Sequence, residues 1–241
     1  MTAVPVTHLD EVGSTNDWLM ERVGELPDGH WVRTDRQTAG RGRRGRVWND
    51  GAGNLMTSVL VKAKGPVQQL SFVAAVALRE AIVTATTGVQ GLSPCPPEAL
   101  LLKWPNDLLL NGKKVSGILL EGSGEAVIIG LGVNLASHPE GTERPATSLG
   151  AAGIALGPRE LHLALVTAFA TWRGRWDHNG FAPVRAEWLR HAGGLGDRIV
   201  ARLGDESIEG RFDGLDADGA LLLGLDDGAT RAIHAGEVFA L

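Results

Sequence analysis

The stretch LLLKWPNDLLLNGKKVSGILLE, residues 100–121, decides the expected fold. It contains three apolar segments, 100–102, 108–110 and 115–120, which are joined by short polar links. Asn111-Gly112 between two of these segments is a strong signal for a two-residue β-hairpin, because both residues tolerate the left-handed backbone of such a turn. We therefore expect adjacent antiparallel strands in this part of the chain.

Segments on either side extend this sheet and cover it. Residues 54–62 and 126–135 have strand-like apolar patterns, whereas residues 68–87 show apolar positions at helical spacing. Residues 158–178 form a second expected helix with proline in its first turn, and 181–191 a third. The sequence therefore predicts an α/β (α+β) fold in which helices flank a mixed or antiparallel sheet.

The pattern changes after residue 194. Short apolar segments now alternate with Asp/Gly turns, at 199–203, 207–212, 220–225 and 230–233, which is typical of a small all-β barrel. We place a domain boundary here, with residues 1–194 as one domain and residues 195–241 as the other. A unit as small as the second is marginally stable alone, so it should pack against the larger one.

Composition limits the function classes. The 241 residues carry 23 Lys+Arg and 28 Asp+Glu, a net charge of -5, and 44% of them are hydrophobic. A nucleic-acid-binding protein usually has a dominant basic face, which this balance does not favour. The amino terminus does not resemble a signal peptide, and no apolar run reaches the roughly 18 residues of a membrane span. We expect a cytoplasmic protein with no membrane partner.

Cysteine and histidine usage argues against a protein-bound transition metal. The single cysteine, Cys95, excludes an internal disulfide and a cysteine-based zinc cluster, and it fits a reducing compartment. The seven histidines include no pair spaced i, i+4. We expect no metal site built from protein residues alone.

One short basic segment stands out in this acidic chain. Residues 40–46 read GRGRRGR, with Gln37 before them and Trp48 after them. Arginine offers a fixed fork of donors to phosphate or carboxylate oxygens, and glycine lets backbone N–H groups approach the same anion. Like-charge repulsion opposes ordering, so we predict a flexible lid that settles over an anionic ligand.

A second polar group precedes the first expected helix. Ser14-Thr15-Asn16 is a helix cap in the simplest interpretation. Three adjacent polar side chains beside free helix N–H groups can also hold a small polar ligand. The sequence alone leaves both interpretations open.

Taken in order, these motifs resemble those of the biotin protein ligases. The matching features are Ser14-Thr15-Asn16, the arginine-glycine loop, KWPND at 103–107 with KKVSGIL at 113–119, and GLGVNL at 130–135. The resemblance covers nearly the whole chain. It implies an α/β catalytic domain followed by a small SH3-like barrel, in agreement with the boundary placed above.

The resemblance implies a two-step reaction. Biotin and MgATP give biotinyl-5'-AMP and pyrophosphate, and a lysine of a biotin carboxyl carrier protein, such as that of acetyl-CoA carboxylase, then attacks the mixed anhydride to release AMP. The implied substrates and cofactors are therefore biotin, ATP and Mg²⁺. The residues implied to bind biotin are Ser14, Thr15, Asn16, Gln37, Arg41, Gly42, Arg43, Lys114 and Gly117.

The resemblance also assigns nucleotide contacts and catalytic groups. The implied ATP-binding residues are Arg43, Arg46, Trp48, Asn106 and Asn134. The implied catalytic residues are Arg43, Lys114 and Asp107, with Asp107 orienting or deprotonating the incoming lysine amine. Lys103 is either part of this site or an ion-pair partner of Asp107.

Several alternatives stay open at this point. A lipoate ligase or an octanoyl transferase shares the fold, a nucleic-acid-binding module would use residues 41–46 as a basic arm, and a biotin sensor would bind without catalysis. Larger family members carry an amino-terminal DNA-binding domain, whereas 13 residues precede Ser14 here. We expect no direct DNA binding, and either a monomer or a homodimer.

Overall fold

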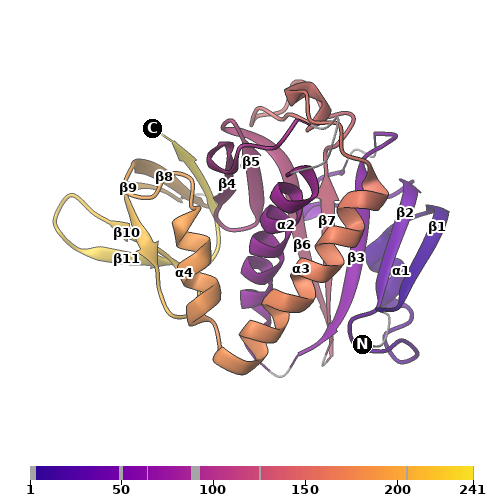
Figure 1. Ribbon diagram of the computed structural model, residues 1–241. Helices are drawn as coiled ribbons and strands as arrows, with labels where there is room; N and C mark the ends of the chain where they lie inside the picture. Colours follow the sequence, from indigo (N-terminus) through magenta and orange to yellow (C-terminus); the bar gives the residue numbers. More distant parts are fainter. Residues whose placement is uncertain are drawn as a thin grey trace.

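The computed structural model describes residues 4–48, 51–63, 65–87, 93–124, 126–204 and 206–240. Its main element is a seven-stranded sheet with the order β1-β2-β3-β7-β6-β5-β4 (Figure 1). The strands are β1 (Val6–Val12), β2 (Trp31–Gln37), β3 (Leu55–Lys62), β4 (Leu100–Lys103), β5 (Asp107–Leu110), β6 (Lys113–Ser123) and β7 (Ala126–Val133). β1 and β2 run parallel and the other neighbours antiparallel, so the predicted mixed sheet is confirmed.

The decisive stretch forms the β4–β5–β6 edge of this sheet. Asn111 and Gly112 connect β5 to β6 with φ angles of 50° and 76°, the left-handed backbone expected for a two-residue hairpin turn. The turn between β4 and β5 contains a cis peptide bond between Trp104 and Pro105. Both strand pairs predicted from the sequence are therefore present.

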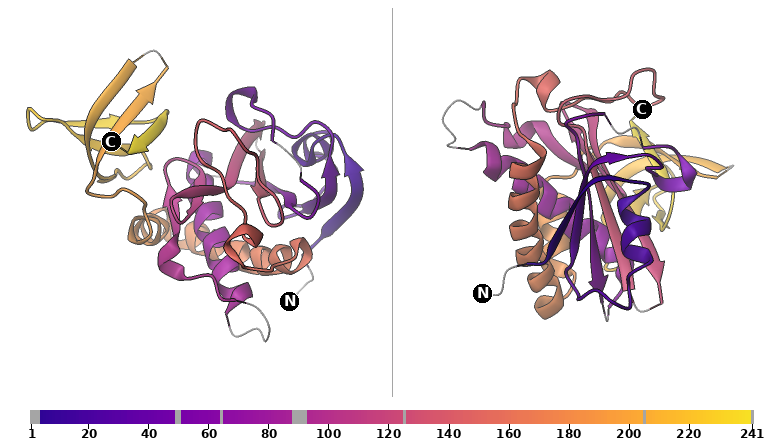
Figure 2. Two further views of the ribbon diagram at one scale, coloured as in Figure 1. Left: turned by 90° about the horizontal axis from the view of Figure 1, so that it is seen from above. Right: turned by 90° about the vertical axis from the view of Figure 1, so that its right-hand side faces the viewer.

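Helices cover both faces of the sheet. α2 (Leu70–Thr86) and α3 (Pro158–Asn179) pack together on one face, and α1 (Thr15–Met20) lies on the other (Figures 1 and 2). The α3 side chain Phe169 meets Trp31 of β2 edge-to-face at 5.4 Å. Leu19 of α1 is buried against Leu60 and Ile128. The sheet is thus fixed from both sides, which holds the ends of β6 and β7 in place.

The helix at Val67–Thr86 is long and apolar enough to cross a membrane, with a mean hydropathy of 1.3. Within the protein, 72% of this segment is buried. Apolar residues around most of its circumference contact the sheet, α3 and α4 (Ala182–Arg190). A helix that is hydrophobic on most sides is typical of a protein core as well as of a bilayer. Its length and composition are therefore accounted for by its place in the core.

The carboxy-terminal part forms a second sheet. Its order is β11-β10-β9-β8-β12, and its neighbouring strands pair antiparallel. The strands are β8 (Arg198–Leu203), β9 (Glu206–Leu215), β10 (Leu221–Gly224), β11 (Thr230–Ile233) and β12 (Glu237–Ala240). The predicted small all-β unit is present as this sheet (Figure 2), and its SH3-like classification stays a prediction.

Aromatic side chains connect the small sheet to the larger unit. Trp104 is buried and donates its indole N–H to the carbonyl of Gly219 at 3.1 Å. Trp188 of α4 contacts both Phe72 of α2, at 5.5 Å, and Phe212 of β9, at 6.4 Å. The prediction that the small unit packs against the larger one agrees with these contacts.

Candidate active site

A cavity of about 370 Å³ lies against β3, β6 and β7, on the face of the large sheet that carries α1. Every residue that the sequence analysis assigned to the site lines it: Ser14, Thr15, Asn16, Gln37, Arg41, Gly42, Arg43, Arg46, Trp48, Asn106, Asp107, Lys114, Gly117 and Asn134. These residues come from distant parts of the chain. The fold therefore brings the predicted motifs together in one place.

One end of the cavity is lined by buried, neutral polar groups. Ser14 caps α1, and the Thr15 backbone N–H and side-chain hydroxyl both donate to Gln37 Oε1, at 2.8 and 3.0 Å. The Ser58 hydroxyl, on β3, lies 2.7 Å from Thr15 Oγ1 and 2.6 Å from Asn16 Oδ1. The cap and the ligand-site interpretations of residues 14–16 are thus compatible, because Ser14 caps the helix while its neighbours face the cavity.

The arginine loop forms a hairpin over the cavity. Arg41 and Val47 form an antiparallel bridge, and Gly42 N–H donates to the carbonyl of Arg46 at 2.7 Å. Trp48 N–H closes the hairpin by donating to the carbonyl of Gly40 at 3.0 Å. The loop is therefore anchored by backbone hydrogen bonds as well as by its side chains.

Carboxylates of the protein itself pair with these arginines. Arg41 donates to both oxygens of Asp17, at 2.6 and 2.7 Å, which lowers the pKa of Asp17. Arg46 lies 3.0 Å from Glu237, on β12 of the small sheet. Like-charge repulsion within the loop, on which the prediction of a flexible lid was based, is thus partly offset. The response of the loop to an anionic ligand stays a prediction.

The opposite end of the cavity is cationic. Lys114 Nζ lies 2.6 Å from Asp107 Oδ1, and Arg144 lies 3.6 Å from Asp107 Oδ2. Arg43 donates to Asn106 Oδ1 at 3.1 Å, and burial lowers the pKa of Arg43. Asp107 is 6% exposed, so its charge is balanced within a largely dehydrated site. Two cations on one carboxylate leave positive charge available for an anionic ligand.

Trp48 lies above two glycines of the sheet. A Cβ atom added to Gly132 would approach the indole to 2.3 Å, and one added to Gly117 would approach it to 3.1 Å. Lys114 Nζ lies 5.9 Å from the centroid of the ring. The absence of side chains at these glycines is what admits the indole to the cavity.

Sequence comparison places the chain among known proteins. Residues 9–134, more than half of the chain, match the model of the biotin/lipoate A/B protein ligase family. The chain belongs to this family. Residues 194–241 also match the model of the biotin protein ligase C-terminal domain.

Individual members of this family are similar to this chain over most of its length. The biotin–[acetyl-CoA-carboxylase] ligase of Paracoccus denitrificans is 42% identical, over 96% of this chain and 98% of that protein. The bifunctional ligase/repressor BirA of Escherichia coli strain K12 is 31% identical, over 97% of this chain and 73% of that protein. The solved biotin protein ligase of Aquifex aeolicus, in complex with biotin and ATP, superimposes with a TM-score of 0.85 at 28% identity, over 98% and 99% of the two chains.

Lys103, in the KWPND motif of this ligase family member, does not serve as the ion-pair partner of Asp107. Asp107 pairs with Lys114 and Arg144, while Lys103 Nζ is buried without a hydrogen-bond partner among the described residues. Burial, together with repulsion from Arg144, lowers the pKa of Lys103 to about 8. The ammonium instead lies 5.9 Å from the ring of Phe239 on β12.

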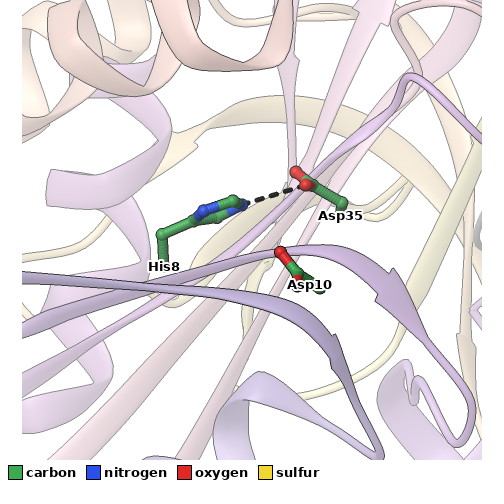
Figure 3. Close-up of side chains that lie close together, drawn as sticks. All are labelled: His8, Asp10 and Asp35. Atoms are coloured by element: carbon green, nitrogen blue, oxygen red, sulfur yellow. Dashed lines mark ion pairs between the residues drawn. The ribbon is translucent and has the colours of Figure 1, made fainter.

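The described residues contain one group with metal-ligand chemistry, away from the cavity. His8 and Asp10 on β1 and Asp35 on β2 have ligand atoms within 4.8 Å of one another (Figure 3). His8 Nε2 lies 3.0 Å from Asp35, whose other oxygen accepts from Arg33 at 3.0 Å. Side chains of the protein therefore already interact with Asp35, and all three group members are exposed, so we assign no metal role to them.

Sequence reasoning missed several side chains around the cavity. Among them are Ser58 and Glu121, which contact Asn16, and Arg144 and Glu237, which contact Asp107 and the arginine loop respectively. Ser58 left a weak signal, since Thr57-Ser58 interrupts an otherwise apolar strand. The other three lie outside the recognised motifs, and only the fold brings them to the site.

Proposed function

We propose that this protein activates biotin with ATP to form biotinyl-5'-AMP and then transfers biotin to a lysine of a biotin carboxyl carrier protein. The observation that carries this proposal is the polarity of the cavity. One end presents the neutral groups of residues 14–16 and Gln37, and the other presents Lys114, Arg43 and Arg46. Biotin has a neutral ureido head and an anionic carboxylate tail, so it matches this polarity when its tail points toward the nucleotide.

For the first step, the cationic end brings two anions together. The biotin carboxylate must approach the α-phosphate of ATP, and pyrophosphate must leave with additional charge. Lys114, Arg43 and Arg46 would offset this repulsion, because fixed positive charges act strongly in a dehydrated site. Mg²⁺ would enter with the ATP phosphates as part of the substrate, since Mg²⁺ commonly binds through phosphate oxygens and few protein ligands.

For the second step, Asp107 is the group placed to serve the incoming lysine. An amine attacks only when it is unprotonated, so a nearby carboxylate accelerates transfer by accepting its proton. Asp107 is engaged by Lys114 and Arg144 in the structure. Binding of biotin and phosphate anions would draw Lys114 toward the ligand, and Oδ1 of Asp107 would then be available to the amine while Arg144 still holds Oδ2.

For the remaining nucleotide contacts, we infer that Trp48 stacks on adenine and that Asn106 and Asn134 contact ATP. Asn134 is 3% exposed at the end of β7, and it donates to the carbonyl of Thr147 at 3.0 Å. This bond ties the strand to the loop that carries Arg144. We also infer that residues 1–194 and 195–241 are separate domains, which the family match from residue 194 supports.

The test is incorporation of radiolabelled biotin into a purified biotin carboxyl carrier domain in the presence of MgATP. Lys114→Ala should abolish labelling, and Lys113→Ala serves as its matched control because Lys113 is the exposed neighbour on the same strand. Lipoate is offered in parallel. Acceptance of lipoate but not biotin would reject the proposal in favour of a lipoate ligase, and equal labelling by both variants would reject the role of Lys114.

A further inference from the structure

Glu121, on β6, contacts two parts of the site that are far apart in sequence. One carboxylate oxygen accepts a hydrogen bond from Asn16 Nδ2 at 2.6 Å, and the other accepts from Arg41 at 3.3 Å. Asn16 belongs to α1 and lines the neutral end of the cavity, whereas Arg41 is at the base of the arginine hairpin. Glu121 therefore connects the neutral end of the cavity to the arginine hairpin that covers it.

The contact with Asn16 fixes the orientation of that side-chain amide. A carboxylate only accepts hydrogen bonds, so the NH₂ group of Asn16 must face Glu121. On the other side, Asn16 Oδ1 lies 2.6 Å from the Ser58 hydroxyl, and Gly130 leaves room for it, since a Cβ there would approach Oδ1 to 2.4 Å. The donor and acceptor that Asn16 presents to the cavity are thus determined by its neighbours.

The contact with Arg41 acts on the hairpin. Arg41 pairs with Asp17 through both terminal nitrogens, and one of these nitrogens also reaches Glu121. The neighbouring Gly42 N–H closes the hairpin through its bond to Arg46. Two carboxylates therefore hold the base of the hairpin, but only Glu121 also holds Asn16.

We propose that Glu121 is a positioning residue that sets which ring system the cavity accepts and fastens the arginine hairpin over it. The specificity half of this proposal rests on the proposed function, because it takes the ureido ring of biotin as the ligand at Asn16. A donor and an acceptor in fixed positions discriminate strongly against a ligand whose own pattern is reversed. The fastening half is a property of the protein alone.

Three variants separate these two halves. Glu121→Gln keeps the size of the side chain, removes its charge, and allows Asn16 to rotate, because glutamine can present either a donor or an acceptor. Asp17→Asn weakens only the Arg41 contact. Glu21→Gln is the matched control, since Glu21 is exposed at the end of α1 and pairs with Arg22 rather than with Arg41.

The activity measurement is ATP-dependent pyrophosphate release with biotin and with 2-iminobiotin, in which a nitrogen donor replaces the ureido oxygen. For Glu121→Gln we expect KM for biotin to rise about tenfold or more, the preference for biotin over 2-iminobiotin to fall, and KM for ATP to stay within about twofold. Asp17→Asn should keep the preference. Loss of the preference in both variants, or in neither, would overturn the specificity half.

Hydrogen exchange on the protein alone tests the fastening half. The amides of Gly42 and Trp48 should exchange faster in both Glu121→Gln and Asp17→Asn than in the wild type or Glu21→Gln. Unchanged exchange in Glu121→Gln would overturn this half. If the wild type releases no pyrophosphate with biotin, the proposed function and the specificity half fail together, and the exchange result still decides the fastening half.

Discussion

Lys114 and Asp107 form an ion pair at 2.6 Å. The proposed chemistry needs the positive charge of Lys114 in the first step and the carboxylate of Asp107 in the second. While Lys114 and Arg144 both hold this carboxylate, an incoming amine cannot replace them, which suits the first step because no base is required there. When an anionic ligand attracts Lys114, the same carboxylate becomes available to an amine. This ion pair can thus keep Asp107 engaged while biotinyl-AMP forms and release it for transfer to the carrier lysine.

Replacing Asp107 with asparagine should therefore affect the two steps unequally. We expect formation of biotinyl-AMP to fall by less than about tenfold, because Lys114 and Arg43 keep their charge. Transfer to the carrier lysine should fall about 100-fold or more, the usual contribution of a general base. Pyrophosphate release and single-turnover transfer from purified biotinyl-AMP measure the two steps. Raising the pH should partly restore transfer, and an equal loss in both steps would contradict the assignment.

At the scale of residues, the sequence identified the groups that lie in motifs and missed those that reach the site through the fold. Lys114 and Arg43 have recognisable neighbours in sequence, so they were predicted. Glu121 is one polar residue at the end of an apolar strand, and a charged residue there is usually a solvated surface group. Its contact with Asn16 depends on the packing of α1 against β3 and β7, which no local pattern encodes.

At the scale of elements, β7 provides the floor of the cavity through two glycines. Glycine within a strand weakens the strand and often marks close approach by another group. Gly130 faces Asn16 and Gly132 faces Trp48. β7 therefore contacts the neutral end of the cavity at Gly130 and the part that we assign to the nucleotide at Gly132.

Substitution of each glycine by alanine should affect a different substrate. Gly130→Ala displaces Asn16, so KM for biotin should rise about tenfold, the approximate effect of losing one good hydrogen bond. Gly132→Ala displaces Trp48, so KM for ATP should rise instead. Gly122→Ala is the control, because a Cβ there meets no atom within 4 Å. Steady-state pyrophosphate release gives both constants, and a rise in the same KM for both variants would refute the division.

Element prediction from sequence succeeded where the pattern was regular. The Asn111-Gly112 turn and the helix at 158–179 follow from local chemistry and periodicity. No strand was predicted at Trp31–Gln37, because only its first two residues are apolar, and its place between β1 and β3 comes from pairing with both. β12 was missed as well, since a four-residue strand at the end of the chain shows too little alternation.

At the scale of the whole molecule, the small sheet contacts the larger unit both in the core and at the cavity. Trp188 joins them in the core, and Glu237 of the small sheet pairs with Arg46 of the hairpin and with Arg144 beside Asp107. Burial alone would raise the pKa of Glu237, but attraction by these arginines outweighs it and the pKa is lowered. The composition change near residue 194 predicted a second unit, but it could not predict that this unit would supply a carboxylate to the site.

The stability of the whole fold should depend on pH through one buried histidine. His162 of α3 is 3% exposed, and its ring meets Trp31 edge-to-face at 5.4 Å. Nε2 has no hydrogen-bond partner among the described residues. Burial, followed by repulsion from Arg33, lowers the pKa of His162 to about 4. The folded protein therefore keeps this ring neutral at pH values where the unfolded chain protonates it.

Between about pH 6.5 and pH 4 the unfolded state binds one proton more than the folded state at this position, so the free energy of unfolding must fall as the pH falls. The full effect is about 3 kcal/mol, is absent above the unfolded pKa and stops growing below about pH 4. His162→Phe keeps a flat ring against Trp31 but cannot bind the proton. Urea unfolding of the wild type and the variant at several pH values measures the difference, in which other titrating groups largely cancel. The free energy of unfolding of the variant should rise relative to that of the wild type as the pH is lowered through this window. A constant difference between the two would mean that His162 is protonated within the folded core.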